Sequence, residues 1–388
     1  MPTYPPLPQS DLPKAEWFEK SADEIQFSYW VPNISGGLVI TTLPMDTEWD
    51  HEANVKYARD AENNGFTTAL AQTRWFASYG ADHQHEAFVI ASHILSNTEK
   101  INIITACHPG LWHPGVVSKI QATLDVISNG RTCINIVSGW FKGEFTGYGE
   151  PWLEHAERYR RSEEFIRIMK GMWNEEEYTF YGDFYTIDGA PMLPKPVHQV
   201  PVFQGGNSKD ARRMAGRVSD VLFMNGNTNE GFTNIITDAR TEAQNVGRDP
   251  SELRFGANGF AIVRDTEQEA VETLREIIVN ADVEAVKGFG EAVKQAGRSS
   301  AEKEGMWANS GFEDLVQYND GFKTGLIGTP DQVADRIMEL KALGVNVILC
   351  GFLHYNWELA NFGKQVIPLV REREEAARVG RKTVAVPG

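Results

Sequence analysis

The residues best suited to holding a charged ligand occur in the segment FQGGNSKDARRMAG, which begins at Phe203. Two consecutive glycines, Gly205 and Gly206, allow a ligand to approach the backbone closely. Ser208 follows at the start of an amphipathic stretch, where the N–H groups and dipole of a helix would favour a phosphate. An ordinary helix cap at Ser208 is the alternative. The segment has neither the GKS or GKT ending of a Walker loop nor the GxGxxG fingerprint of a dinucleotide site.

Two further motifs place polar groups where a ligand could use them. In INIVSGWFKGEF, Asn135 lies inside an apolar run, and a buried amide without partners costs about 1–3 kcal/mol. Asn135 therefore either bonds to neighbouring backbone or contacts a ligand. Glu144, near the end of the motif, either contacts the same ligand or forms an exposed ion pair with Lys142. In HAERYRRSEEF, Arg158 and Tyr159 suit a phosphate contact, although a solvated charged helix face is the simpler interpretation.

Other familiar chemistries find little support. The sequence contains no GxSxG nucleophile motif and no HExxH metal motif, so we expect neither a serine hydrolase nor a metal site. Cys107, Cys133 and Cys350 each lie in an apolar run without CxxC spacing. They are expected to be buried, reduced thiols, which fits a reducing compartment.

Composition narrows the class of partner. The 388 residues are 41% hydrophobic and carry a net charge of −16, enough for a full core and unfavourable for nucleic acid or an anionic membrane surface. No apolar run reaches the roughly 18 residues of a membrane span, and the proline-rich start lacks the apolar centre of a signal peptide. We therefore expect a cytoplasmic protein.

The elements that must position these residues alternate along the chain. Short apolar runs are separated by amphipathic stretches, which predicts parallel strands joined by helices. Eight such units favour an α/β fold of the TIM (β/α)8 barrel type over an open sheet. The expected strands cover residues 25–31, 66–72, 101–107, 132–138, 200–206, 220–226, 254–263 and 345–352, and the expected helices cover residues 51–64, 85–96, 116–127, 154–173 and 230–245, with others from 209 and 267, and 330–344 and 357–370 near the C-terminus.

Two insertions interrupt this pattern. Residues 178–187 alternate around a Gly-Asp turn and predict a β-hairpin. Residues 281–327 are long, polar and partly helical, and we interpret them as a lid from which Lys323 reaches the site. The expected organisation is an N-terminal extension over residues 1–24 outside the barrel, one barrel domain over 25–373 and a C-terminal tail over 374–388.

A TIM barrel carries its active site at the C-terminal ends of its strands. Polar and aromatic residues that follow the expected strands are therefore candidates for catalysis, most of them better suited to shaping a pocket than to transferring a proton. The candidates are Arg74, Trp112, His113, Trp140, Lys323 and His354, with His108 at an equivalent position.

The motifs NIVSGWFKGEF, WLEHAERYRRSEEF, GDFY and FQGGNS resemble those of the flavin-dependent luciferase-like monooxygenases of bacteria. The resemblance extends over nearly the whole chain, from Ile25 to Arg371. It implies FMN contacts wherever the motifs match. These positions are Thr73, Arg74, Asn135, Glu144, Arg158, Tyr159 and Ser208.

The resemblance also implies an activity. The segments SYWVPNISGGLV and FEDLVQYNDGFKTGLIGTP are most similar to a branch of the family that cleaves a carbon–sulfur bond in a small sulfone with O2 and reduced FMN (FMNH2). A separate NAD(P)H:FMN reductase would supply the FMNH2, and the family usually forms dimers or tetramers. An alkanesulfonate or pyrimidine-type oxygenase is the alternative. A deazaflavin-dependent dehydrogenase and a flavin carrier without turnover are more distant ones.

Overall fold

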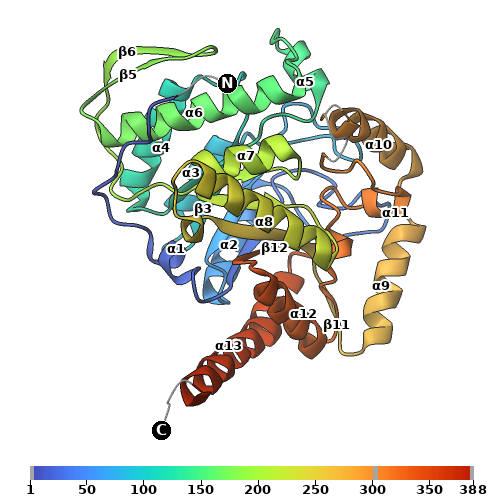
Figure 1. Cartoon of the computed structure of the whole chain (residues 1–388). Helices are drawn as coiled ribbons and strands as arrows, with labels where there is room; N and C mark the ends of the chain where they lie inside the picture. Colours follow the sequence, from blue (N-terminus) through green and yellow to red (C-terminus); the bar gives the residue numbers. More distant parts are fainter. Residues whose placement is uncertain (1–3, 299, 301–304, 385–388) are drawn as a thin grey trace.

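Within residues 4–298, 300 and 305–384, which the computed structural model describes, eight parallel strands close into a barrel surrounded by helices (Figure 1). The strand order around the barrel is β1-β12-β9-β8-β7-β4-β3-β2. This arrangement confirms the predicted TIM barrel. Its strands are β1 (Gln26–Val31), β2 (Thr68–Ala71), β3 (Asn102–Cys107), β4 (Thr132–Ile136), β7 (Val202–Gly205), β8 (Val221–Met224), β9 (Arg254–Phe260) and β12 (Val347–Gly351).

Helices pack on the outer face of the barrel. The long helices lie close to the ranges expected from the sequence. No helix in the described part of the chain is long and apolar enough to cross a membrane. The outer helices are α2 (His51–Asn63), α3 (Ala87–Ser96), α4 (Pro114–Ser128), α6 (His155–Asn174), α7 (Lys209–Val218), α8 (Asn229–Asn245), α12 (Pro330–Leu343) and α13 (Glu358–Val384). Shorter or inserted ones are α1 (Glu16–Lys20), α5 (Lys142–Gly147), η1 (Pro250–Glu252), α9 (Glu267–Val279), α10 (Val283–Arg298), α11 (Phe312–Leu315) and η2 (Gly321–Thr324).

Helix α13 runs to Val384, past residue 370 at which the sequence pattern places its end. Charged pairs support the extra turns. Arg371 bonds to Glu374 one turn further on, and Arg373 reaches Asp331 of α12. Pairs of this kind stabilise a helix without any apolar periodicity, so hydrophobic patterning did not detect this part of α13.

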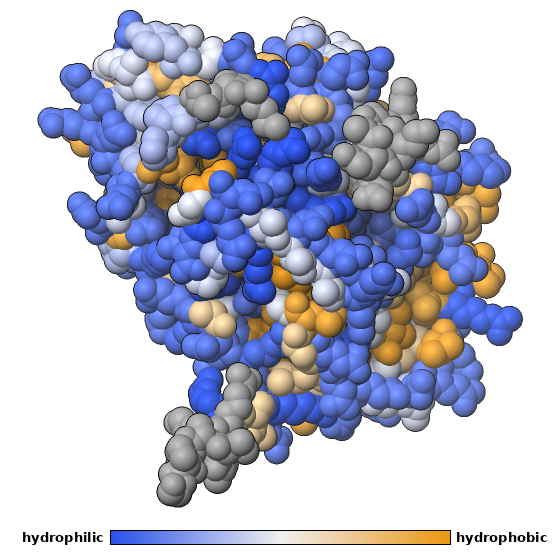
Figure 2. Space-filling model, viewed as in Figure 1, coloured by the Kyte–Doolittle hydropathy of each residue, from blue (hydrophilic) through white to orange (hydrophobic). Residues whose placement is uncertain are grey.

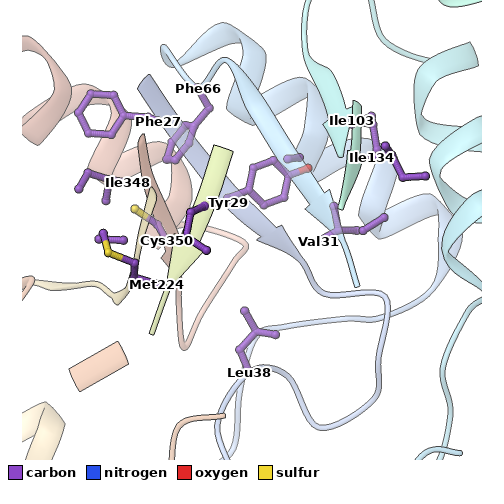
Figure 3. Packing of buried hydrophobic residues seen from close by; sticks show 14 of the residues in the cluster. Phe27, Tyr29, Val31, Leu38, Phe66, Ile103, Ile134, Met224, Ile348 and Cys350 are labelled. Atoms are coloured by element: carbon purple, nitrogen blue, oxygen red, sulfur yellow. The ribbon is translucent and has the colours of Figure 1, made fainter. Parts of the chain in front are cut away.

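The core has two compartments, one on each side of the barrel wall. The helix-facing compartment includes Phe27, Tyr29 and Phe66, whose rings pack edge to face beside β1 (Figure 3). The interior compartment holds side chains from alternate positions of the strands, as the pleat of a barrel requires. Its members include Leu70, Ile104, Cys133, Phe203, Val221, Phe223, Val347 and Leu349.

Helix α1 closes the N-terminal end of the barrel. Its Trp17 and Phe18 join the interior compartment, and the Trp17 ring stacks on Phe203 at 5.8 Å. Phe203 stacks in turn on Phe223 at 5.1 Å. The sequence places residues 1–24 outside the barrel and does not predict α1. In the described part of that segment, this helix is too short to show a periodic pattern, yet it seals one end of the core.

The two insertions leave the barrel from opposite sides. Strands β5 (Glu177–Tyr181) and β6 (Thr186–Pro191) pair antiparallel and confirm the predicted hairpin. The second insertion begins after β10 (Ile262–Val263) and ends at β11 (Ile327–Gly328), and these two strands pair with each other in parallel. This small sheet was not predicted, and it anchors both ends of the insertion at the barrel. Most of the visible surface is hydrophilic, in keeping with the high charge, but hydrophobic residues gather at the right of the view, where α9 lies (Figure 2).

Candidate active site

A cavity of about 140 Å³ lies at the C-terminal ends of the strands. Its floor consists of inward-facing barrel residues, among them Trp30 of β1 and Asn258 of β9. The Trp30 indole Nε1 donates to Asn258 Oδ1 at 3.0 Å, and the Asn258 amide donates to the Met224 carbonyl at 3.0 Å. These bonds fix the orientation of both floor side chains.

The second insertion supplies the roof of the cavity. The aromatic roof is formed by Phe289, Trp307 and Tyr318 of the insertion, and it packs on Trp140 from the segment after β4. The Trp140 ring lies 5.8 Å from Phe289 and 6.0 Å from Trp307 between ring centroids. These contacts place aromatic, largely apolar surface over the cavity.

Two roof contacts hold strained backbone. Tyr79 and Trp307 have positive φ angles of 55° and 60°, a conformation that costs a non-glycine residue about 1–2 kcal/mol. The Trp307 indole donates to the Tyr318 carbonyl at 2.7 Å, and the Tyr318 hydroxyl donates to the Tyr79 carbonyl at 2.7 Å. Strained backbone of this kind persists only where surrounding contacts hold it, and it is found most often at functional sites.

Arg74, in the loop after β2, brings a cation to the cavity wall. Its side chain is only 8% exposed, and its guanidinium carbon lies 5.6 Å from the ring centroids of Trp140 and Tyr318. One terminal nitrogen donates to the Ser78 carbonyl at 3.0 Å and also bonds to the Ser78 hydroxyl. The Nε atom is buried without a hydrogen-bond partner. Arg74 is thus a buried cation with a spare donor.

Glu144, the expected flavin contact in α5, lies behind the cavity wall. Its Oε1 accepts hydrogen bonds from the backbone N–H of Trp75 at 2.7 Å and of Phe76 at 3.2 Å. Burial raises the pKa of the Glu144 carboxyl, and the two backbone hydrogen bonds oppose that change. The carboxylate therefore holds the loop that carries Arg74, and it is absent from the side chains that line the cavity.

His108, after β3, completes this support. Its Nδ1 lies 3.0 Å from the Val137 carbonyl, to which it donates, and its Nε2 lies 3.9 Å from Glu144 Oε2. Burial lowers the pKa of His108 to about 4, so its imidazole is neutral at pH 7. The neutral His108 ring thus has a structural role, because its hydrogen bond to the backbone connects two neighbouring loops.

A second polar region adjoins the cavity at Tyr159 and Ser208. Ser208 caps α7 by accepting from the Ala211 N–H at 3.3 Å, and its side chain also hydrogen-bonds to the Tyr159 hydroxyl. Gly206 has φ +144°, and a Cβ there would lie 2.7 Å from the Tyr159 hydroxyl oxygen. Only glycine fits between Tyr159 and the start of α7, so Gly206 allows this tyrosine to lie close to the backbone; the close approach of a ligand at Gly205 and Gly206 stays a prediction.

Arg158 lies beside this region. Its guanidinium donates to the Leu153 carbonyl at 2.8 Å and stacks over the Trp152 ring at 4.1 Å. Tyr159, and not Arg158, is among the residues that line the cavity.

The cavity wall matches the chemistry of a flavin. Asn135 Oδ1 and the Ser138 hydroxyl are buried there without hydrogen-bond partners, and a polar ring system would satisfy both. A Cβ at Gly205 would meet no atom within 4 Å, so open space adjoins the backbone. The cavity volume of about 140 Å³ is below the roughly 300–1,000 Å³ typical of small-molecule sites. A whole flavin therefore needs more room than the roof leaves in this arrangement.

The structure brings together only part of the predicted site. The predicted residues that line the cavity are Thr73, Arg74, Asn135, Trp140 and Tyr159. Trp112 packs on Trp75 at 6.1 Å, and His113 caps α4 by accepting from the Gly115 N–H at 3.2 Å.

Lys323 and His354 also point elsewhere. The Lys323 ammonium pairs with Asp314 at 3.0 Å and with Asp320 at 3.3 Å. The His354 Nδ1 accepts from the Asp46 N–H at 3.1 Å. Neither side chain lines the cavity in the described structure.

Sequence reasoning missed the floor and most of the roof. Asn258 lies in the apolar run RFGANGFAIV, as Asn135 does in its own run, so the argument from buried amides applied to it equally. Phe289 and Trp307 had no such signal, because aromatic residues in an irregular insertion have no pattern that tells a cavity roof from an ordinary core.

Residues 29–346 match the family described as Luciferase-like monooxygenase, and the chain belongs to this family. It is 53% identical over 356 residues to the FMNH2-dependent dimethylsulfone monooxygenase of Pseudomonas putida, a match that covers 91% of this chain and 97% of the relative. The protein of the same name from Pseudomonas fluorescens (strain Pf0-1) is 51% identical over 361 residues, with 93% and 98% covered.

A solved structure supports the fold. The crystal structure of DmoA from Hyphomicrobium sulfonivorans superimposes with a TM-score of 0.74 at 17% identity, covering 90% of this chain and 88% of that chain.

Proposed function

We propose that this protein is an FMNH2-dependent monooxygenase that cleaves a C–S bond of dimethyl sulfone. The balanced reaction converts dimethyl sulfone, O2 and FMNH2 into methanesulfinic acid, formaldehyde, FMN and water. The observation that carries the proposal is the 53% identity to a dimethylsulfone monooxygenase over 97% of its length. The aromatic and otherwise mostly uncharged lining of the cavity suits a substrate of low polarity.

We assign different residues to cofactor binding and to enclosing the substrate. Asn135 and Ser138 would satisfy the polar edge of the flavin, and the Tyr159–Ser208 region would receive its phosphate at the start of α7. When bound, reduced FMN supplies the two electrons that dioxygen needs to oxidise the substrate. The aromatic roof excludes water, which protects the reacting groups from side reactions.

The charge of the cavity favours a sulfone over the alternative alkanesulfonate. Among the described residues that line the cavity, Arg74 is the one that carries a full charge. A permanently anionic sulfonate would be expected to meet two or more converging cations. A neutral sulfone needs only a donor for its oxygens and apolar walls for its methyl groups.

Three further properties belong to the same proposal. A separate NAD(P)H:FMN reductase supplies FMNH2, the protein acts in the cytoplasm, and it assembles as a dimer or tetramer. The family resemblance supports the reductase and the assembly, and three buried cysteines without a disulfide support a reducing compartment.

A coupled assay tests the proposed function. Purified protein is mixed with an FMN reductase, NADH, O2 and dimethyl sulfone, and formaldehyde and methanesulfinate are measured. Equal amounts of both products, dependent on the protein and on FMN, are expected. Sulfite release from alkanesulfonates without turnover of the sulfone would instead establish the alternative.

A further inference from the structure

We infer that the Arg74 guanidinium is the subsite for the sulfonyl oxygens, where it binds the sulfone weakly and the sulfinate product strongly. The inference rests on the proposed function and gives Arg74 a substrate-binding role in place of the flavin contact that the family resemblance implies. Arg74 lines the cavity, is 8% exposed and has a buried Nε–H without a hydrogen-bond partner. A buried, unpartnered donor at a cavity wall requires a ligand to satisfy it.

The surroundings of Arg74 leave its charge available. A buried cation is normally paired with a carboxylate, yet no ion pair involving Arg74 occurs in the described part of the chain. Glu144, the carboxylate behind the loop, uses Oε1 on the N–H groups of Trp75 and Phe76. The Glu144 carboxylate therefore acts on Arg74 only through its charge at longer range. The direct contacts of the guanidinium are neutral: the Ser78 carbonyl, the Tyr318 hydroxyl, and the rings of Trp140 and Tyr318.

This environment matches the change in charge during the reaction. With O2 as the oxidant and FMNH2 as the reductant, one oxygen atom of O2 is inserted into a C–H bond of one methyl group and the other leaves as water. The C–S bond then breaks with its electron pair on sulfur, while the hydroxyl loses its proton and the carbon leaves as formaldehyde, so a neutral sulfone becomes an anionic sulfinate. The oxygens on sulfur gain negative charge as the bond breaks. A fixed cation beside them is worth more in the transition state than in the ground state, which is the requirement for catalysis.

The same geometry accounts for the rest of the substrate. Trp140 and Tyr318 flank the guanidinium and line the cavity, so a methyl group attached to sulfur would contact their rings while the oxygens meet Arg74. A single guanidinium can donate to both oxygens of one sulfonyl group, because its donors lie in one plane.

The test compares Arg74→Met and Arg74→Lys with wild type. Methanesulfinate is titrated in two ways: as an inhibitor of dimethyl sulfone turnover, and against flavin-free protein by tryptophan fluorescence, for which Trp140 beside Arg74 is a reporter. FMN affinity is measured separately by flavin fluorescence. Arg59→Met is the matched control, because Arg59 is exposed on α2 and bonds to the Asn97 carbonyl.

We expect Arg74→Met to reduce kcat/KM for dimethyl sulfone by about 10²–10³-fold, as loss of an oxyanion donor does. Methanesulfinate binding should weaken by at least tenfold, with the FMN dissociation constant changed less than about threefold. Arg74→Lys keeps the charge without the planar donors and should be intermediate. Arg59→Met should match wild type.

Several outcomes would overturn the inference. An FMN affinity that falls as much as the sulfinate affinity would make Arg74 a flavin contact, and unchanged sulfinate binding in the Arg74 variants would remove the subsite. If Arg74→Met does not fold, the same comparison is made with Arg74→Lys. The flavin-free titration also separates this inference from the proposed function: wild type that binds methanesulfinate through Arg74 without turning over the sulfone contradicts only the function.

Discussion

The two ends of the barrel are built for opposite purposes. At the N-terminal end, α1 inserts Trp17 and Phe18 against Phe203, and stacked rings fill the interior. At the C-terminal end, the interior opens into a cavity whose wall holds Arg74 and Asn135 with unsatisfied polar atoms. One fold thus separates the packing that stabilises it from the polar groups that need a ligand, as TIM barrels generally do.

Among the variants that test this difference between the two ends of the barrel, Trp17→Ala is expected to have the largest effect. Removing this buried ring should lower the free energy of unfolding by about 3–5 kcal/mol, because the cavity it leaves cannot collapse fully. Activity of the protein that remains folded should change little, since the ring lies at the end opposite the site. Chemical denaturation and steady-state kinetics measure the two quantities. A selective loss of kcat with unchanged stability would show that the N-terminal end of the barrel does not have the purely stabilising role described above.

A smaller loss is expected from Glu144→Ala behind the active-site loop. The backbone N–H groups of Trp75 and Phe76 lose their acceptor, which should cost about 1–3 kcal/mol of stability. The loop then positions Arg74 less well, so KM for the sulfone should rise. Glu144→Gln keeps an acceptor oxygen and should restore most of both properties. Equal damage from the two variants would show that the carboxylate charge, and not its hydrogen bonds, matters.

The pH dependence of stability tests whether His108 is neutral in the folded protein. Its folded pKa of about 4 lies below an unfolded value of about 6.5, so the unfolded chain binds the proton first as the pH falls. Stability is complete above pH 6.5 and should decline toward pH 4, by about 2 kcal/mol at pH 5. Glu144, whose pKa is raised above its ordinary value, acts in the opposite direction, because the folded protein binds that proton before the unfolded chain does as the pH falls. Denaturation of His108→Asn between pH 7 and pH 5 should show a flatter decline. An unchanged slope would mean that His108 has the same pKa in the folded and the unfolded protein.

The smallest effect is expected at the junction of Tyr159 and α7. A methyl group in Gly206→Ala would meet the Tyr159 hydroxyl and the Ala211 Cβ at 2.6 Å, which displaces the tyrosine or the helix start. FMN affinity should fall by about tenfold, equal to about 1.4 kcal/mol, with less effect on methanesulfinate binding. Fluorescence titration of FMN measures the first, and Gly247→Ala on an open surface turn is the control. Unaltered FMN affinity would place the phosphate elsewhere.

The sequence predicted the framework because barrel strands are periodic and apolar. It drew attention to Asn135, which lines the cavity, because an amide in an apolar run needs a hydrogen-bond partner. It also indicated Ser208 as a helix cap or phosphate contact; the structure has the cap, and the phosphate contact stays a prediction. It did not predict α1, because five residues show no period, nor the extension of α13, which depends on charged pairs.

The misplaced site residues have a common cause. Position after a strand brings a residue to the correct end of the barrel, but not to the cavity. His113 caps its helix and Lys323 pairs with acidic neighbours, and both outcomes depend on contacts within loops that no sequence pattern encodes. The roof residues came from an insertion whose path could not be derived from periodicity.

We propose that the polar end of this barrel oxidises a small sulfone with reduced FMN. The most direct measurement is the coupled assay with 18O2, dimethyl sulfone and purified protein, followed by mass analysis of formaldehyde, trapped as it forms, and methanesulfinate. Both products are expected in equal amounts, with the new oxygen in formaldehyde and both sulfinate oxygens from the substrate. Label in the sulfinate, or no product from the sulfone at all, would contradict it.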